Sequence, residues 1–443
     1  MKTTAPKSEK LEVRSEEKNQ NTFFSLQNSH FSIPPPALVP KLRFPEFRNA
    51  AGWESKRLGE LFSDRQESGM SGLPLLSLMD KEGIVPQADS NRKNNSNSDK
   101  SKYLRVVPGD IAYNTMRMWE GRSALVGLEG LVSPAYTVCE PQPGTHSLLF
   151  SYYFKTPQLI EQFQRFSQGL VKDTLNLKYP AFALISASVP TYPEQQKIAE
   201  CLSSVDELIV VQARKLDALK THKKGLMQQL FPREGETQPR LRFPEFQDAG
   251  DWVEYSLGQL IEIASGQVDP KQPPYCDSPQ IGSENIESHS GKLVNVKSAG
   301  EKGVISGNYA FDENDILYSK IRPALNKVAA PEFKGICSAD IYPIRPADGT
   351  LLRSYLFYLL LSQDFLDYAI QNSERGKIPK INRDALVTYK ALIPLPAEQQ
   401  RIADCLSSLD DLIPAQTQTL EALKTHKQGL MQQLFPSPEA ASA

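Results

Sequence analysis

The sequence contains little cysteine and little histidine, and neither residue type is grouped. The five cysteines (Cys139, Cys201, Cys276, Cys337 and Cys405) are scattered without any CxxC pair, and the five histidines are equally dispersed. Metal-binding thiols and imidazoles normally occur at short fixed spacings, so no metal site is expected. Scattered cysteines in odd number indicate free thiols in a reducing compartment.

A long apolar segment is also missing. No apolar run approaches the roughly 20 residues that a membrane-spanning helix needs. Residues 1–20 (MKTTAPKSEKLEVRSEEKNQ) lack the apolar core of a signal peptide. We therefore expect a cytoplasmic protein with no membrane partner. The net charge of −2 shows no overall excess that would indicate a polyanionic partner, although local basic patches remain compatible with one.

The signatures of a nucleic-acid enzyme are absent as well. No GxxxxGK[ST] phosphate loop occurs, so ATP-driven translocation is not encoded. The nearest string to the Asn/Asp-Pro-Pro-Tyr motif of adenine methyltransferases is QPPY at 272–275, which has the wrong first residue and no glycine-rich turn before it. A Pro-rich loop is the preferred interpretation. With no nuclease-type cluster of carboxylates and lysine either, we predict no catalytic residue and no cofactor.

What the sequence does contain is one long segment that occurs twice. Residues 218–232 (ALKTHKKGLMQQLFP) recur at 422–436 (ALKTHKQGLMQQLFP) with a single difference. The likeness extends back to the Glu-Gln-Gln runs at 194–196 and 398–400 without insertion or deletion. A long match without any change in length indicates a geometric constraint on the segment, and surface loops are not constrained in this way.

Apolar residues follow one another at steps of three and four through both copies. This seven-residue repeat, with polar interruptions at equivalent places, predicts a coiled-coil seam in which buried polar residues set register and partner choice. Each segment would form a rod of roughly 55 Å at about 1.5 Å per residue. Periodicity alone leaves open two amphipathic helices that each pack on their own domain. The seam residues are Leu202, Val205, Ile209, Gln212, Leu216, Leu219, Lys223, Leu226 and Leu230, and then Leu406, Leu409, Ile413, Gln416, Leu420, Leu423, Lys427, Leu430 and Leu434.

The second copy has one irregularity, a proline at position 414 where the first copy has Val210. Proline removes a backbone donor from a helix. We therefore expect either a kink or a break between a short helix and the long rod.

A second duplicated segment precedes each globular part. KLRFPEFRNAAGWESKRLGELF, from Lys41, recurs as RLRFPEFQDAGDWVEYSLGQLI, from Arg240. The shared Arg-Phe-Pro-Glu-Phe run, tryptophan and Leu-Gly pair indicate an extended segment that anchors aromatic side chains. The chain is therefore a tandem repeat of about 200 residues. A polar stretch between two prolines indicates a linker at the joint.

An α+β fold is expected for each repeat. Short runs rich in β-branched and aromatic residues, at 109–113 and 314–318, indicate strands, and residues 148–166 and 351–370 indicate helices. The globular parts otherwise differ widely in sequence. We therefore expect the duplicated segments to perform the same task in both repeats, and the globular parts to perform two different versions of a second task. The expected division is a disordered tail (1–39), a first globular domain (40–193), a first helical segment (194–232), a linker (233–239), a second globular domain (240–397), a second helical segment (398–436) and a short tail (437–443).

The duplicated order of these motifs resembles the specificity (S) subunit of type I restriction–modification systems. The resemblance covers residues 40–436, and although each motif is weak, the repeated order is specific. It implies two target recognition domains, each recognising one half of a bipartite sequence in double-stranded DNA. It also implies two helical spacers that pair antiparallel as a coiled coil, set the distance between the halves and dock two methylation (M) subunits. Restriction (R) subunits then join, and the S subunit itself is not catalytic.

The residues give independent support for this resemblance. Two recognition domains on one face of B-DNA must lie about one turn, roughly 34–36 Å, apart. A rigid rod holds such a spacing, whereas a flexible linker does not. Because the two globular parts are unlike, the recognised site should be split and asymmetric.

Basic loops supply the candidate DNA contacts. Arginine and lysine bind guanine or phosphate, and asparagine binds adenine. The alternative for each residue is a solvated surface charge, and Arg117 and Arg322 can equally be residues that pair with acids inside the fold. Residues 91–102 (NRKNNSNSDKSK) are compatible with a mobile loop that orders on DNA, or with one that has no role. The candidates are Arg117, Arg122, Lys172, Asn176 and Lys178 in the first domain, and Lys320, Arg322, Arg375, Lys377, Lys380, Asn382 and Arg383 in the second.

The identity of the two helical segments exceeds what pairing alone requires, because a seam tolerates exchange among apolar residues. Residues 220–222 and 227–229 are the same as 424–426 and 431–433, which indicates two copies of one partner. Recent duplication is the alternative. Two other functions remain open: the recognition subunit of a related methylase–nuclease without a separate translocating subunit, and a coiled-coil scaffold that does not recognise DNA.

Overall fold

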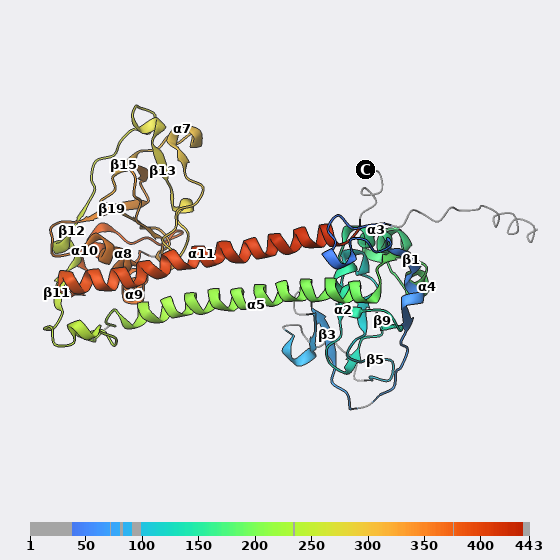
Figure 1. Ribbon diagram of the computed structural model, residues 1–443. Coiled ribbons are helices and arrows are strands. Elements are labelled where there is room, and N and C mark those ends of the chain that lie inside the picture. The colour runs from blue at the N-terminus through green and yellow to red at the C-terminus, as the bar shows by residue number, and fades with distance from the viewer. Residues whose placement is uncertain are drawn as a thin grey trace, which may run out of the picture. The chain divides into compact units, whose positions relative to one another are not determined.

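The computed structural model describes residues 38–70, 72–79, 83–90, 99–233, 235–374 and 376–436 (Figure 1). The chain divides into two compact units. The first comprises the described residues up to Ser204 together with those from His426 onward, and the second runs from Val205 to Thr425. Each unit therefore contains one globular part, the start of the long helix that follows it and the end of the other long helix. Among the described residues, no helix is both long and apolar enough to cross a bilayer.

The first unit contains a four-stranded antiparallel sheet in the order β2–β9–β6–β7. Three strand pairs, β1–β10, β3–β4 and β5–β8, accompany it. The strands are β1 (Glu54–Arg57), β2 (Phe62–Asp64), β3 (Leu76–Met79), β4 (Gly83–Pro86), β5 (Leu104–Val106), β6 (Ile111–Asn114), β7 (Ser123–Leu125), β8 (Gly130–Val132), β9 (Tyr136–Pro141) and β10 (Ser186–Val189). The helices are α1 (Leu58–Leu61), α2 (Ser147–Tyr153), α3 (Pro157–Phe166), α4 (Tyr179–Ala183) and the first part of α5 (Tyr192–Gln229).

The core of the first unit is aromatic. Phe62, Phe150, Phe154 and Phe182 are completely buried and pack edge to face or tilted against one another. The end of α11 (Pro396–Leu434) closes this core, because the ring of Phe435 stacks on Tyr153 at 4.7 Å between centroids and meets Trp53 edge-on at 6.3 Å. The second repeat thus supplies part of the core of the first globular part.

The second unit contains two four-stranded sheets, ordered β12–β19–β16–β17 and β14–β13–β18–β15, and the pair β11–β20. Its strands are β11 (Val253–Ser256), β12 (Ile261–Ile263), β13 (Pro279–Ile281), β14 (Lys297–Ser298), β15 (Asn308–Phe311), β16 (Ile316–Ser319), β17 (Val328–Ala329), β18 (Gly335–Ser338), β19 (Ile341–Pro346) and β20 (Lys390–Ile393). Its helices are α6 (Leu257–Leu260), α7 (Ala299–Lys302), α8 (Arg353–Leu361), α9 (Gln363–Gln371), α10 (Arg383–Thr388) and parts of α5 and α11.

The core of the second unit repeats the pattern of the first. Leu230 and Phe231, just after α5, are buried in the cluster that contains Trp252 and Tyr355. The rings of Phe231 and Tyr355 lie 5.4 Å apart. The duplicated Leu-Phe pair therefore has the same task in both units, which accounts for part of the identity between the two helical segments.

The duplicated Arg-Phe-Pro-Glu-Phe and Glu-Gln-Gln motifs bond to each other. Arg43 pairs with Glu194 at 2.7 Å, and Arg242 pairs with Glu398 at 2.9 Å; the four side chains are at most 8% exposed. Each guanidinium also donates to two backbone carbonyls of its own leading segment. The hydrogen bond to Glu194 raises the pKa of Arg43, so the guanidinium of the pair stays charged as the pH rises.

The glutamine after each glutamate orders the start of a helix in the globular part. Gln195 accepts from the backbone N–H of His146, the residue before α2, and Gln399 accepts in the same way from Leu352, the residue before α8. Each amide also donates to two backbone carbonyls. A buried glutamine thus accepts from the N-cap residue in both units, as the N3 side chain does in a capping box.

The two predicted helical patches at 148–166 and 351–370 each contain two helices. Pro157 occupies the first turn of α3, and the Ser362 hydroxyl accepts from the backbone of Phe365 at the start of α9. Both positions are typical helix starts, so the chain turns there although the apolar pattern continues.

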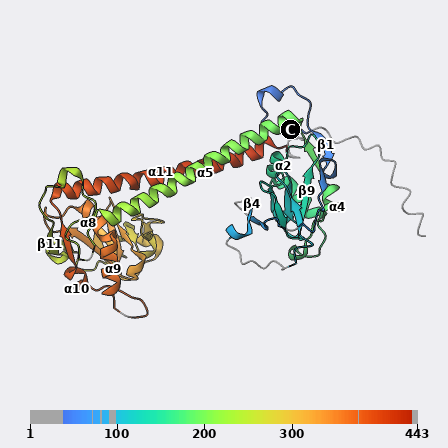
Figure 2. The same cartoon turned by 90° about the horizontal axis from the view of Figure 1, so that it is seen from below.

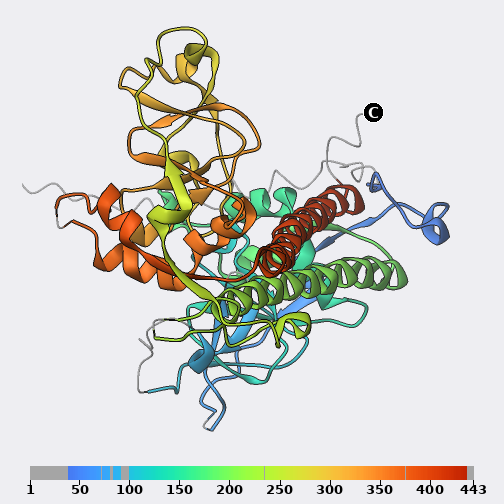
Figure 3. The same cartoon turned by 90° about the vertical axis from the view of Figure 1, so that its left-hand side faces the viewer.

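Within the second unit, α5 and α11 lie side by side and run in opposite directions (Figures 1, 2 and 3). The Gln212 amide donates to the side-chain oxygen of Gln416 at 2.6 Å, and Lys223 forms an ion pair with Asp410. A residue further along α5 thus contacts a residue earlier in α11, as in an antiparallel pair of helices. Every predicted seam residue on both helices is buried or half-buried.

Of the two outcomes expected at Pro414, a kink or a break, the break is wrong, because α11 is a single helix from Pro396 to Leu434. Proline leaves one backbone acceptor, four residues earlier on Asp410, without its helical donor. The side chain of Asp410 is held by Lys223 and by the hydroxyl of Tyr358, and Leu409 beside it is buried. We attribute the continuity of α11 to this packing, which outweighs a local cost of about 3 kcal/mol.

Candidate nucleic-acid interface

In the first unit, a closed loop carries two of the predicted DNA-binding residues, Lys172 and Asn176, and Lys178 follows just after it. Gln168 and Asn176 exchange two backbone hydrogen bonds, at 2.9 and 2.8 Å, that close the loop. Just beyond, the N–H of Leu177 donates to the carbonyl of Thr115 at 2.8 Å. This bond ties the loop to the turn after β6, the segment from which Arg117 and Arg122 project.

In the second unit the corresponding loop has the same anchor. Glu374 donates to the carbonyl of Lys380 at 2.8 Å, and Ile381 donates to the carbonyl of Lys320 at 2.9 Å. A further bond, from Arg322 to the carbonyl of Pro379, measures 2.7 Å. The structure therefore brings together two groups of predicted residues, Lys320 with Arg322 and Lys377 with Lys380, that lie far apart in the sequence.

The basic side chains of these loops are exposed, and some of them also contact other side chains. Lys172, Lys178, Arg322, Lys377 and Lys380 are exposed. Lys172 lies over the ring of Trp119 at 5.9 Å, and Lys380 forms an exposed ion pair with Glu374 at 3.3 Å. Exposed pairs of this kind contribute little and open readily when a phosphate competes.

Two arginines of the first unit share one acid. Arg117 and Arg122 both bond Glu120, at 3.0 and 3.2 Å. The three side chains lie at a half-exposed turn, so the pairing is local and orients both guanidinium groups.

Asn382 and Arg383 have structural partners. Asn382 caps α10 by accepting from the backbone of Ala385 at 2.8 Å, and Arg383 donates to the carbonyls of Ile263 and Ala264. These contacts fix the end of the loop. Arg375, also a predicted contact, lies outside the described residues, as do 91–98 of the predicted mobile stretch 91–102.

The backbone of Arg322 is in the left-handed region, with φ of +50°. An arginine in this conformation is uncommon and costs free energy that its surroundings must offset. The bond from its N–H to Pro379 holds it there, so the basic loop and the strand-end turn fix each other.

The sequence analysis missed the residues that fix the opposite end of the same central strand in each unit. Asp110 and Asp315 are each 1% exposed and each caps the turn before a central strand. Arg65 binds Asp110 at 2.9 Å, and Arg345 binds Asp315 at 2.8 Å. Burial raises the pKa of Asp110, and the hydrogen bonds from the Val107 backbone and from Arg65 oppose this by stabilising the carboxylate.

The aspartate occurs at equivalent places in both repeats, so the sequence could have indicated the two buried acids. It could not have indicated their arginine partners. Arg65 follows β2, whereas Arg345 belongs to β19, so the two guanidinium groups reach equivalent acids from different strands. No alignment of the two repeats matches one arginine with the other.

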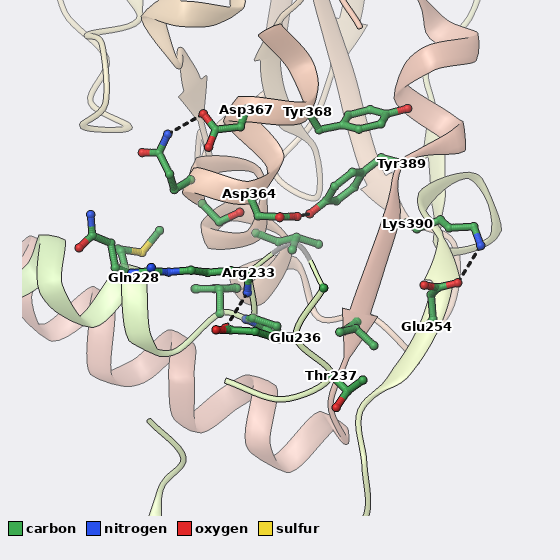
Figure 4. Close-up of a pocket in the computed structure, with 18 of the residues that line it drawn as sticks. Gln228, Arg233, Glu236, Thr237, Glu254, Asp364, Asp367, Tyr368, Tyr389 and Lys390 are labelled. Atoms are coloured by element: carbon green, nitrogen blue, oxygen red, sulfur yellow. Dashed lines mark hydrogen bonds and ion pairs between the residues drawn. The ribbon is translucent and has the colours of Figure 1, made fainter. Parts of the chain in front are cut away.

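A pocket of about 950 Å³ lies elsewhere in the second unit, beside the end of α5 (Figure 4). Asp364 accepts from the hydroxyl of Tyr389 at 2.7 Å inside it, and Lys390 pairs with Glu254 at 2.8 Å. Asp367 and Glu236 add further negative charge. This lining does not suit a nucleic-acid backbone, so the pocket is not the candidate interface.

Known proteins are similar to the part of the chain that contains the second unit's basic loop. Residues 249–425 match the family of type I restriction modification DNA specificity domains. Over these residues the chain is similar to a type I DNA specificity domain. The matched range contains the second unit's basic loop and the strand-end turn that anchors it. The resemblance to type I specificity subunits expected from the sequence is thereby confirmed.

Known specificity subunits are similar to this chain over different lengths. The specificity subunit of the type I restriction enzyme EcoDI of Escherichia coli is 34% identical over 173 residues, which span 39% of this chain but only 38% of that protein. That of MjaVIII of Methanocaldococcus jannaschii is 23% identical over 364 residues, 76% of this chain and 82% of that protein.

A solved structure extends the similarity to the whole fold. The crystal structure of the type I restriction–modification S subunit from M. genitalium superposes with a TM-score of 0.52 and 14% sequence identity. The superposition covers 90% of this chain and all of that one. At this identity the likeness shows a shared mixed helix and sheet fold.

Proposed function

We propose that this chain selects the DNA target of a type I methyltransferase and restriction complex. Its two globular parts act as target recognition domains in tandem, and each recognises one half of a split, asymmetric sequence in double-stranded DNA. The chain itself catalyses no step. Methylation and cleavage belong to partners, two M subunits and the R subunits, with which it acts in the cytoplasm.

One observation carries this proposal most strongly. Each unit ties a basic loop to the turn after its central strand by an equivalent backbone bond, Leu177 to Thr115 and Ile381 to Lys320. The surroundings of the two loops differ in sequence. A shared scaffold with unlike side chains is what recognition of two different half-sites requires.

We assign different tasks to the candidate residues. Exposed lysines and arginines bind phosphates or guanine, and Asn176, with Arg117 and Arg122, belongs to the same surface. Asn382 and Arg383 position the second loop. Arg375 is proposed as a contact on its sequence position alone. The proposed contacts are Arg117, Arg122, Lys172, Asn176, Lys178, Lys320, Arg322, Arg375, Lys377 and Lys380.

The two long helices would form the spacer between the domains as an antiparallel coiled coil. The Gln212–Gln416 hydrogen bond and the burial of the seam residues support this pairing. Polar pairs at such positions set register more than they add stability. Lys220, Thr221 and His222 are exposed, like their equivalents 424–426, and would dock the two M subunits.

A methylome tests the function. Modified adenines are mapped in the native host with the gene intact and with it deleted. The expected result is the loss of one split, asymmetric motif on deletion, which also supplies both half-sites. An unchanged methylome, combined with failure of any methyltransferase to co-purify, would favour a coiled-coil scaffold that does not recognise DNA.

The nature of the complex needs a second measurement. Co-purification with separate methyltransferase and translocating nuclease subunits is expected. A single fused methylase–nuclease partner would instead identify the related systems that lack a translocating subunit.

A further inference from the structure

The tip of the first unit's loop displays an apolar side chain without any cover. Leu170 is 101% exposed, more than any other large apolar side chain of the described residues, and Val171 beside it is 61% exposed. A single exposed leucine is ordinary on a protein surface. What makes this one informative is the way the loop holds it.

The loop is folded back on itself and holds the leucine at its exposed tip. Gly169 has φ of +143°, and a Cβ atom at that position would lie 2.5 Å from the carbonyl oxygen of Thr174. The Thr174 N–H and hydroxyl both donate to the carbonyl of Val171, at 2.9 and 3.0 Å. With the Gln168–Asn176 bonds at its base, the tip is shaped before anything binds.

The neighbourhood of the tip is cationic. Lys172 follows it directly, and Lys178 is exposed beyond the closing bonds. The turn that anchors the loop carries Arg117 and Arg122, which both pair with Glu120. Apart from Asp173, the charges around the loop therefore suit a phosphate backbone. Lysine is depleted at the core of protein–protein interfaces, so Lys172 directly beside the tip favours nucleic acid over a partner protein.

We propose that Leu170 is a wedge that enters the duplex between two base pairs of the half-site recognised by the first unit, and kinks the DNA there. This rests on the function proposed above. Apolar side chains presented by DNA-binding proteins insert in this way, partially unstacking a base step. The step being opened then contributes to sequence selection without any hydrogen bond to a base, because steps differ in how easily they unstack.

The second unit offers a contrast. Its loop holds Ile378 between Lys377 and Lys380, but the isoleucine is only 47% exposed. The loop tip is therefore less available for insertion, and we place the wedge in the first unit alone.

The test uses the chain together with its methyltransferase partner and a short duplex carrying the site found in the methylome. Dyes at the two duplex ends report bending by energy transfer, and titration reports affinity. Wild type should bend the duplex. Leu170→Ala should bind about tenfold more weakly and leave the duplex straighter, since most of one leucine's burial is lost. Leu128→Ala is the matched control, because Leu128 is 48% exposed in the same unit but lies outside the loop.

Each outcome has one meaning. Equal bending and affinity for wild type and Leu170→Ala would overturn the wedge. So would loss of methyltransferase co-purification on Leu170→Ala, which would make the leucine a protein contact. If wild type itself does not discriminate the site from a scrambled duplex, the proposed function fails instead. Melting temperatures of the three proteins should agree, because both leucines are solvent-exposed.

Discussion

At the residue scale, the buried arginine–glutamate pairs are expected to dominate stability. Removing one partner of such a pair leaves an uncompensated buried charge. Glu194→Ala should therefore lower the free energy of unfolding of the first unit by about 3 kcal/mol. Urea unfolding followed by tryptophan fluorescence measures this, because Trp53 lies in the same core.

An exposed acid in the segment that carries Arg43, the partner of Glu194, provides the control. Glu46 pairs with Lys197 at 3.5 Å, and both side chains are about half exposed. Glu46→Ala should cost less than about 1 kcal/mol. Equal losses for the two variants would show that burial does not decide the contribution of these pairs.

A second residue-scale prediction concerns the basic loop of the second unit. Lys377→Ala should weaken DNA binding by the methyltransferase complex and lower the slope of log affinity against log salt by about 0.9, the value for one phosphate contact. Lys334→Ala, which removes an exposed lysine paired with Glu313 at 3.8 Å elsewhere in the unit, should leave the slope unchanged. An unchanged slope for Lys377→Ala would remove this residue from the interface.

At the element scale, the long helices were the most predictable part of the chain. Their seven-residue period follows from helix geometry alone, and its polar interruptions fall where Gln212 meets Gln416 and Lys223 meets Asp410. The continuity through Pro414 was not predictable, because it depends on contacts made by other elements.

The candidate site was predictable in composition but not in assembly. The basic loops and strand-end turns carry suitable residue types in the sequence. That Ile381 bonds Lys320, and that Asn382 is a helix cap, depends on backbone geometry across a long chain separation. The partner of Asp315 could not be found either, because Arg345 has no counterpart at the same position of the first repeat.

The element-scale prediction tests the helices as a ruler. Duplicating residues 206–212 in α5 and 416–422 in α11 adds one repeat to each helix and repeats the polar pair in phase. The rods lengthen by about 10 Å, which corresponds to about three base pairs. The methylome should show the same half-sites with a gap about three base pairs longer.

A two-residue insertion at the same two places is the control. It turns the apolar face of each helix by about 200°, so the seam is out of phase and methylation should be lost rather than re-spaced. If the seven-residue duplication leaves the gap unchanged, the helices do not set the spacing.

At the scale of the whole molecule, both globular parts are held by the same set of contacts. Ile198, Ala199 and Leu202 of α5, with Leu434 at the end of α11 and Phe435 just after it, pack in the first core. Their equivalents in the second core are the same residue types: Ile402, Ala403, Leu406, Leu230 and Phe231. The ion pair and the buried glutamine are repeated too. Each globular part should therefore fit the place of the other.

This equivalence makes a prediction about DNA. We exchange residues 43–194 with 242–398 within one chain, so that the helices and their ends keep their places. If an antiparallel spacer relates the two places by a twofold rotation, the exchanged chain recognises the reverse complement of the original site. On double-stranded DNA this is the same site. The methylome of a host expressing the exchanged chain should thus be unchanged, whereas replacing only one globular part by that of another specificity subunit should change one half-site. A new motif from the exchanged chain would mean that the two places are not equivalent and that the duplicated contacts preserve the fold without preserving the geometry of recognition.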